Sequence, residues 1–413
     1  MPFTVLDSTG RVLLDVAVIL LAARAGGLLF ARAGQPAVIG EIAAGVALGP
    51  TLLGTLPGDP SSDLFPPGAM DTLRLIGQLG LVLFMFGVGW DLDLQLVRQR
   101  EGAALAVSVG STLLPFALGL ALAVYLHPDH DTVAGEAVPF WPFALFVGAS
   151  LALTAFPVLA RILHESRLAA TPLGALTLTA AAADDVIGWS VVAVALAALA
   201  SSGPWDYVRI VLESALFVVF VVVAVRPLLH TLLRDPSPAR EALVLPVAFA
   251  GAYATEAIGI HAVFGAFLIG TVMPLKPGVP ALERLRRQLS GAIAVLAPIY
   301  FVTSGLLVDI PALRANDLAA FVLIMAAACA GKFLGAFGGA RAAGVATRDS
   351  VALGVLLNTR GLIEIVLLTV GRDAGLIDDR LFTLLALMAI ATTLLTSPVL
   401  RRVGPRVRDP VTA

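Results

Sequence analysis

Residues 172–200 read PLGALTLTAAAADDVIGWSVVAVALAALA, an apolar run whose only charges are Asp184 and Asp185. A helix that crosses the hydrocarbon core of a bilayer needs about 20 apolar residues, and this run exceeds that length. Two carboxylates near its middle cost about 2.5 to 3.5 kcal/mol each on insertion scales, and such groups usually mark an ion or proton path. The stretch therefore predicts a transmembrane helix that carries a functional centre.

Apolar runs of similar length recur along the rest of the chain. Of the 413 residues, 58% are hydrophobic and 14% are charged, against about 25% charged in soluble domains, and the mean hydropathy is +0.94. This composition excludes a soluble globular protein. The net charge of -2 and the lack of a dense basic block exclude a nucleic-acid partner. We expect an all-α polytopic membrane protein that contacts lipid and needs no cofactor.

Thirteen segments are predicted to cross the membrane. With the N-terminus outside and the C-terminus cytoplasmic, Lys and Arg lie about three times as often in the cytoplasmic loops as in the outer ones, as the positive-inside rule requires. We expect one transmembrane domain over residues 1–413, in the cytoplasmic membrane. The segments are 12–31, 36–56, 72–90, 102–126, 140–163, 172–200, 207–229, 241–258, 260–274, 290–308, 318–340, 350–371 and 381–400.

The amine of Lys332 lies near the middle of segment 318–340. Lysine, unlike arginine, can lose its proton when buried, which suits a site that handles protons. Adjacent residues on a helix point about 100° apart, so one of Asp184 and Asp185 can meet Lys332 while the other faces a cavity. The alternative is an ion pair that only pins two helices, with the second aspartate protonated.

Two predicted segments are interrupted at mid-membrane. In segment 140–163, Pro157 removes a backbone donor and clashes with the carbonyl of Leu153. Segment 350–371 contains the polar break Asn358-Thr359-Arg360-Gly361. Interrupted helices in corresponding positions of two halves point to a transporter's binding site. Because these segments lie seven apart, they cross in opposite directions, and we expect an inverted repeat whose half-helix ends present carbonyl groups to a cation.

Arg360 and Glu364 are four residues apart on one helix face, where they most simply neutralise each other. We expect this pair to support the break rather than to bind the ion directly. Pro157, Asn358 and Thr359 are expected to support the interrupted helices in the same way, although an ordinary proline kink is the alternative for Pro157 taken alone.

Taken together, these motifs resemble the monovalent cation:proton antiporter-2 family, which includes sodium/proton antiporters and glutathione-gated potassium efflux systems. The resemblance covers nearly the whole chain, and it rests on the order and spacing of strings that are weak singly. The strings are Gln35-Pro36-Ala37-Val38-Ile39-Gly40-Glu41 with Gly49-Pro50, Thr154-Ala155-Phe156-Pro157-Val158-Leu159, Ala183-Asp184-Asp185, Phe301-Val302-Thr303-Ser304-Gly305-Leu306, Gly331-Lys332 and Asn358-Thr359-Arg360-Gly361.

The resemblance implies a thirteen-helix sodium/proton antiporter fold, in which a core domain with two crossing discontinuous helices moves against a dimerisation domain. It implies that Asp185 is the main cation-binding carboxylate, that Asp184 pairs with Lys332, and that Thr154 lies at the break next to the ion. The transported ions would be Na⁺ or K⁺ and protons. Unlike the gated potassium efflux members, the chain is not expected to carry a C-terminal nucleotide-binding domain.

Competition for one carboxylate explains how such a protein couples two gradients. A buried carboxylate favours its protonated form, whereas a bound cation favours the ionised form, so proton and cation exclude each other. No covalent chemistry is required, and the chain is not expected to be an enzyme. Two alternatives remain, namely a sodium-coupled symporter of a small organic anion and a cation channel.

A homodimer is expected from the resemblance and from the small residues at positions 22–27 of the first segment. The sequence Ala22-Ala23-Arg24-Ala25-Gly26-Gly27 offers a surface on which another helix can approach closely. The alternative is that these glycines pack against helices of the same chain.

Overall fold

The fold consists almost entirely of α-helices, joined by short loops. A two-stranded antiparallel hairpin, β1 (Thr132–Val133) with β2 (Glu136–Ala137), is the exception among the residues described. The computed structural model describes residues 8–91, 101–155, 158–159, 162–163, 168, 171–200, 204–234, 237–259, 262–274 and 279–403.

Within this described part, nine helices are long and apolar enough to cross a membrane, and three shorter apolar helices accompany them. All the predicted segments overlap described helices, so the prediction of a polytopic helical protein is confirmed. The count of thirteen crossings remains a prediction, because the shorter helices do not reach spanning length within the described residues.

The helices divide between two compact units, each with its own core. The first unit comprises Met1–Leu29, Gly40–Leu94 and Ala200–Leu307. Its helices are α1 (Ser8–Arg32) and α2 (Ala37–Leu48) for most of their length, η1 (Leu53–Thr55), α3 (Pro60–Leu64), α4 (Pro67–Asp91), α10 (Pro204–Phe220), the π-helical turn η3 (Val221–Val225), α11 (Arg226–Leu232), α12 (Pro238–Glu241), α13 (Val244–Ile258), α14 (Ala262–Thr271) and α15 (Pro280–Gly305).

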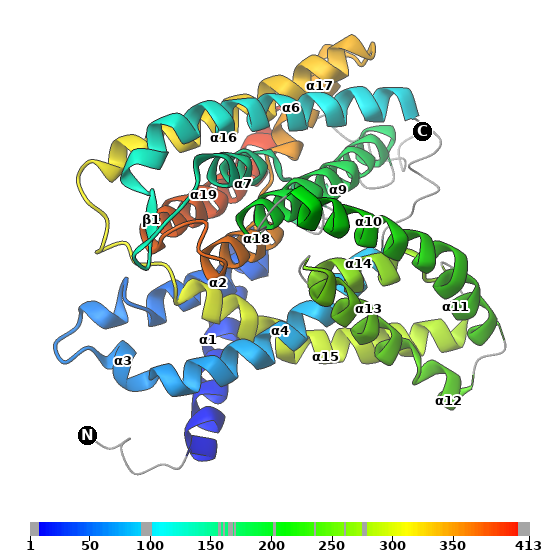
Figure 1. Ribbon diagram of the computed structural model, residues 1–413, viewed down its shortest axis with the longest axis horizontal. Helices are drawn as coiled ribbons and strands as arrows, with labels where there is room; N and C mark the ends of the chain where they lie inside the picture. Colours follow the sequence, from blue (N-terminus) through cyan, green and yellow to red (C-terminus); the bar gives the residue numbers. More distant parts are fainter. Residues whose placement is uncertain are drawn as a thin grey trace. The chain divides into compact units, whose positions relative to one another are not determined.

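The second unit comprises Phe30–Ile39, Gln95–Leu199 and Val308–Ala413, and it holds every described side chain of the candidate site. Within it, α6 runs beside α16 and α7 packs against α6 (Figure 1). Its helices are α6 (Glu101–Leu126), η2 (His127–Asp129), α7 (Phe140–Ala152), most of α9 (Pro172–Ala200), α16 (Asp317–Ala342), α17 (Thr347–Leu357), α18 (Leu362–Asp373) and α19 (Asp379–Val403).

Glycines on α16 let this helix touch the backbone of α6. A Cβ atom at Gly335 would overlap the carbonyl oxygen of Gly110, one at Gly339 would overlap the carbonyl oxygen of Ala106, and one at Gly331 would collide with Pro115. Residues four apart share a helix face, and such small-residue ridges allow close packing of membrane helices. The ridge therefore brings the polar side chains of α6 within reach of Lys332, the residue after Gly331.

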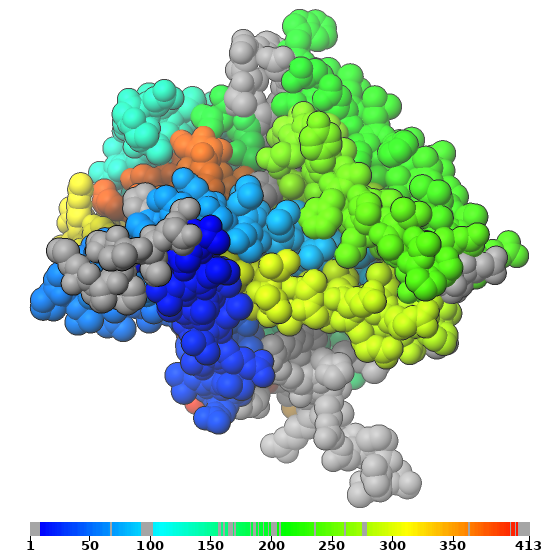
Figure 2. Space-filling view, turned by 90° about the horizontal axis from the view of Figure 1, so that it is seen from below, coloured from blue at the N-terminus to red at the C-terminus, as the bar shows by residue number. Residues whose placement is uncertain are grey.

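In the first unit, α1 lies against α15, as the blue and yellow-green surfaces of Figure 2 show. Ile19 and Ala23 share an apolar core with Ile299 and Val302. A Cβ atom at Gly26 would overlap the carbonyl oxygen of Gly40 in α2. Gly26 thus packs within its own chain, so this part of the small-residue argument for a homodimer is not supported.

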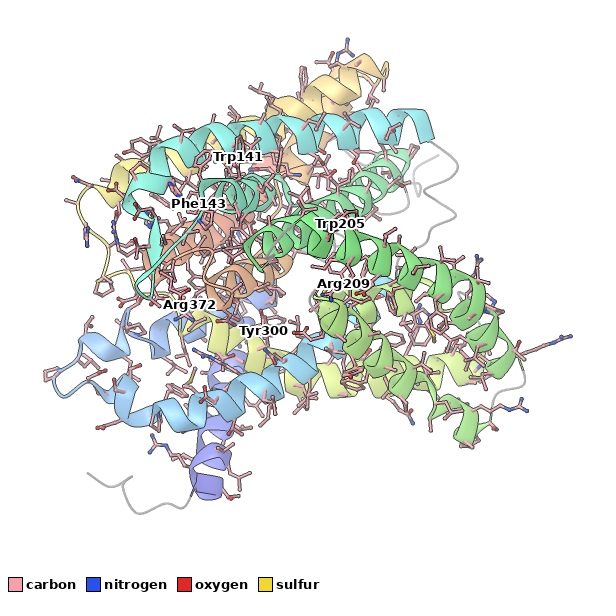
Figure 3. The ribbon with its side chains drawn as sticks, in the orientation of Figure 1. Trp141, Phe143, Trp205, Arg209, Tyr300 and Arg372 are labelled. Atoms are coloured by element: carbon pink, nitrogen blue, oxygen red, sulfur yellow. The ribbon has the colours of Figure 1, made fainter. Side chains whose placement is uncertain are left out.

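At the start of α7, one aromatic side chain is buried and another is exposed. Phe143 is fully buried, whereas 69% of Trp141 is exposed (Figure 3). The loop before α7 is tied to the turn between α18 and α19, because His130 Nδ1 lies 2.8 Å from Asp378 Oδ2. The start of α7, the end of α6 and the end of α18 are thereby held together within the second unit.

Candidate functional site

Two interrupted helices meet at the centre of the second unit. The helix α7 stops at Ala152, and the chain between α17 and α18 is not helical. The N–H of Ala155 donates to the carbonyl of Thr359 at 3.0 Å, and Thr154 Oγ1 lies 3.2 Å from the carbonyl oxygen of Leu357. Gly361 has φ of 144°, which favours glycine and starts α18 in a new direction. The predicted breaks are thus present as helix ends that contact each other.

An ion pair with no solvent exposure lies beside this junction. Lys332 Nζ on α16 donates to Asp184 Oδ2 on α9 at 2.9 Å and to Thr154 Oγ1 at 2.7 Å. All three residues have 0% exposure. Asp184 and Lys332 are therefore in contact, as the family resemblance led us to expect. A buried charge pair is stable only when further hydrogen bonds satisfy its remaining polar atoms.

Four hydroxyl groups supply those hydrogen bonds to Asp184. Ser108 and Thr112 on α6 each lie 2.8 Å from Oδ1, Ser111 lies 2.9 Å from Oδ2, and Thr154 lies 3.0 Å from Oδ2. With Lys332, the carboxylate has five donors around it. The three hydroxyls of α6 were missed by the sequence analysis. The signal that could have found them is the run Ser108-Val-Gly-Ser111-Thr112, which puts three hydroxyls on one helix face.

A second buried ion pair lies on α18 and at its start. Arg360 Nη1 is 3.1 Å from Glu364 Oε1 and 3.2 Å from Oε2, and both residues are almost wholly buried. The same guanidinium donates from Nη1 to the carbonyl of Ser150 at 2.6 Å and from Nη2 to the carbonyl of Leu151. Arg360 and Glu364 neutralise each other as expected. In addition, Arg360 closes the last turn of α7, which neither residue type nor spacing could reveal.

The contact of Arg360 with the carbonyls of Ser150 and Leu151, which we call the Arg360 clamp, changes what the end of α7 is expected to bind. The carbonyls of the last turn of α7 were expected to face a cation, but two of them accept hydrogen bonds from Arg360. A guanidinium at the C-terminal end of a helix neutralises the partial negative charge there. The end of α7 at Ser150 and Leu151 is therefore bound to Arg360, and the described oxygen atoms that contact the ion pair directly are side-chain hydroxyls.

The other predicted site residues fall partly within the described structure. Asn358 donates from Nδ2 to Cys329 Sγ at 3.6 Å. Asn358 Oδ1 and Thr359 Oγ1 are buried without a hydrogen-bond partner among the described residues. Such oxygen atoms at a helix break suit a dehydrated cation. Pro157 and the side chain of Asp185 lie outside the described residues, although the backbone of Asp185 follows Asp184 on α9.

The groups at this site can bind ions and exchange protons. Its described groups are a carboxylate, an amine, hydroxyls and an amide, which can exchange protons or surround a cation with oxygen. Among the residues described, His, Cys, Asp and Glu form no group of three that could hold a metal ion. The arrangement suits small monovalent ions more than a chelated transition metal.

Comparisons with known proteins match this chain to cation/proton antiporters. Residues 17–403 match the family model described as "Sodium/hydrogen exchanger, transmembrane". The Na(+)/H(+) antiporter NhaS4 of Synechocystis is 38% identical over 95% of this chain and 97% of its own length. The K(+)/H(+) antiporter 1 of Saccharomyces cerevisiae is 33% identical over 95% of this chain, which spans 46% of that longer protein.

Solved structures show the same fold at low sequence identity. The sodium proton antiporter MjNhaP1 from Methanocaldococcus jannaschii matches with a TM-score of 0.66 and 16% identity, over 97% of this chain and 100% of that one. At this identity the match concerns the fold alone.

Proposed function

The chain belongs to the sodium/hydrogen exchanger family, and from this premise we propose that it is a secondary antiporter that exchanges Na⁺ or K⁺ for protons by alternating access. The observation that carries the proposal is the fully buried contact between Asp184 and Lys332 at the junction of two helix breaks. The names of NhaS4 and of the yeast K(+)/H(+) antiporter support it.

We assign the roles at the site as follows. Asp185 is the main cation-binding carboxylate, Asp184 holds the proton-exchanging amine of Lys332, and Thr154 offers an oxygen ligand between them. Asn358 and Thr359 support the break, with buried oxygens that lack a partner among the described residues. A cation at Asp185 and a proton on the same group exclude each other, which couples the two fluxes without ATP.

The wider architecture proposed here has thirteen crossings, with the N-terminus outside and the C-terminus in the cytoplasm, in the cytoplasmic membrane. Its support is the match to the MjNhaP1 fold and the interruption of α7 and of α17–α18 at corresponding places. Residues 1–413 act as a single exchanger domain, and two copies form a homodimer. Crosslinking in membranes that detects only monomers would contradict the dimer.

Transport in proteoliposomes tests the function directly. An outward proton gradient should drive uptake of Na⁺ or K⁺ by the purified protein without any organic substrate, and parallel assays with Li⁺ and Rb⁺ would define the selectivity. Uptake that requires an added organic anion would instead favour the sodium-coupled symporter. Single-channel currents would favour a cation channel.

Asp185→Asn tests the assigned carboxylate. We expect exchange to be abolished while the protein still inserts and folds, since a neutral side chain in a membrane-spanning helix avoids the cost of placing a charge there. Asp373→Asn is a matched control, because Asp373 is an exposed aspartate of the same unit, paired only with Arg372 among the described residues. Retention of cation-driven proton movement by Asp185→Asn would reject its role.

A further inference from the structure

The connection between α1 and α2 is held on α19 by a side chain that the proposed exchange mechanism does not use. Gln35 Nε2 donates to the carbonyl of Leu394 at 3.2 Å. The orientation of this amide is fixed, because a carbonyl oxygen can only accept a hydrogen bond. Gln35 Oε1 is buried without a hydrogen-bond partner among the described residues. The contact with Leu394 is therefore the hydrogen bond that holds this side chain in place.

The carbonyl of Leu394 is available because of a proline inside α19. In an α-helix the carbonyl of residue 394 accepts from the N–H of residue 398, and that residue is Pro398. Proline has no N–H, and its ring clashes with the carbonyl four residues earlier. The Gln35 amide therefore supplies a hydrogen bond that α19 cannot make by itself. An N–H at position 398 would satisfy the same carbonyl, but it would not join α19 to the connection before α2.

The residues next to this hydrogen bond border the helix break between α17 and α18. Thr393, which directly precedes the bonded carbonyl, accepts from the N–H of Arg360 at 3.2 Å through Oγ1. Ile39, at the start of α2, is fully buried, and a Cβ atom at Gly361 would lie 3.8 Å from its Cδ1 and 3.8 Å from Thr393 Oγ1. All of these residues belong to the second unit. The hydrogen bond of Gln35 thus joins two elements that both contact the break.

We infer, on the basis of the antiport function proposed above, that Gln35 is a positioning residue for cation binding, because it ties α19 to the start of α2 around the break at residues 359–361. The break contains the buried Oγ1 of Thr359, which has no hydrogen-bond partner among the described residues, and the Thr359 carbonyl that binds Ala155. Without the tie, α19 and α2 can shift independently, and the oxygen atoms of the break shift with them. Gln35 thus acts on the cation through these neighbours.

The test separates the tie from the mere satisfaction of a carbonyl, using cation-driven exchange in proteoliposomes at constant pH. Gln35→Met removes the donor at nearly constant volume. The KM for the transported cation should rise about fivefold, which corresponds to about 1 kcal/mol at 1.4 kcal/mol per tenfold, the net contribution of one hydrogen bond. The thermal midpoint should fall as well, because the carbonyl of Leu394 loses its donor.

Pro398→Ala provides the decisive second variant. Pro398 is exposed, so alanine leaves no buried cavity, and it restores an N–H for the carbonyl of Leu394. In Gln35→Met with Pro398→Ala, the thermal midpoint should therefore recover while the KM stays raised, since the tie is still missing. Pro398→Ala alone should keep the wild-type KM, because a carbonyl oxygen has two lone pairs and can accept from Gln35 as well.

Gln288→Met is the matched control, because Gln288 is an exposed glutamine on α15, and both its KM and its thermal midpoint should equal those of the wild type. A wild-type KM in the double variant would overturn the inference, since Gln35 would then only satisfy a carbonyl. The double variant decides the question even if Gln35→Met alone does not fold. Absence of exchange by the wild type would instead refute the proposed function.

Discussion

Two buried ion pairs of the second unit resemble each other in burial and differ in what surrounds them. Asp184 and Lys332 are enclosed by side-chain hydroxyls, which can rotate and can both donate and accept. Arg360 and Glu364 are fixed to backbone carbonyls of α7. Lysine can release its proton, whereas arginine remains charged.

The difference separates a site that can change its protonation from one that holds helices together. A buried charge pair is weak evidence for stability as such, but removal of one member leaves an unpaired charge and is costly. The Arg360 pair should therefore dominate stability, and the Asp184 pair should dominate transport. The following predictions test this contrast.

Arg360→Met should cause the largest loss. It leaves Glu364 unpaired and removes the donors of the Ser150 and Leu151 carbonyls, at a cost of about 3 to 5 kcal/mol. Unfolding in mixed micelles, titrated with SDS, measures this. The control is Arg209→Ala, since Arg209 on α10 (Figure 3) also pairs with a glutamate four residues on, but at 63% and 42% exposure. An equal effect of both substitutions would contradict the clamp.

Lys332→Met should cost less, about 2 kcal/mol, because Asp184 keeps its hydroxyl donors after the amine is lost. Adding Asp184→Asn should recover part of the loss, since no unpaired charge then remains. The four-member cycle, measured by the same unfolding assay, gives the coupling energy. Losses that add within about 0.5 kcal/mol would show that the two residues do not interact in the resting state.

Thr393→Val should have a smaller effect, about 1 kcal/mol. Thr393 Oγ1 on α19 accepts from the N–H of Arg360 at 3.2 Å, in the break before α18. Thr396→Val is the control, because the Thr396 hydroxyl bonds the carbonyl of Thr392 in its own helix. If Thr396→Val lowers the free energy of unfolding as much as Thr393→Val does, the contact of Thr393 with Arg360 does not contribute measurably to stability.

Asp378→Asn should show the smallest effect, and one that depends on pH. Burial alone would raise the pKa of Asp378, but hydrogen bonds from His130 and the Leu381 N–H, with the charges of His130 and Arg380, hold its pKa below the usual value. A carboxyl with a lowered pKa stabilises the fold above its unfolded pKa of about 3.9 and loses that contribution as the pH falls further.

The measurement compares thermal midpoints of wild type and Asp378→Asn at neutral pH and at pH values below about 3.9. The difference should hold from neutrality down to about pH 4 and shrink as the pH falls below that value. Asp373→Asn, at the exposed end of α18, should show no such trend. A difference that grows as the pH falls would contradict the sign of the shift.

The sequence predicted the helices well because hydropathy over 20 residues is a local property. It also predicted that one of Asp184 and Asp185 meets Lys332, because few charges lie at mid-membrane and a buried charge needs a partner, whereas the choice of Asp184 came from the family resemblance. The fold class, the two interrupted helices and the Arg360–Glu364 pair all follow from such local patterns.

Other features of the site depend on long-range packing and were not predictable. Ser and Thr in membrane helices commonly bond their own backbone, as Thr177 does, so the shared helix face of Ser108 and Thr112 does not by itself identify Asp184 as their partner. The carbonyl partners of Arg360 lie more than two hundred residues away in the chain. Gly26 was attributed to a subunit interface, but it contacts Gly40 in α2.

The hydrogen bond from the N–H of Ala155 to the carbonyl of Thr359 joins the two helix breaks through their main chains. Because both atoms belong to the backbone, the contact does not depend on which side chains stand at these two positions. Among the natural amino acids, only proline at position 155 deletes its donor.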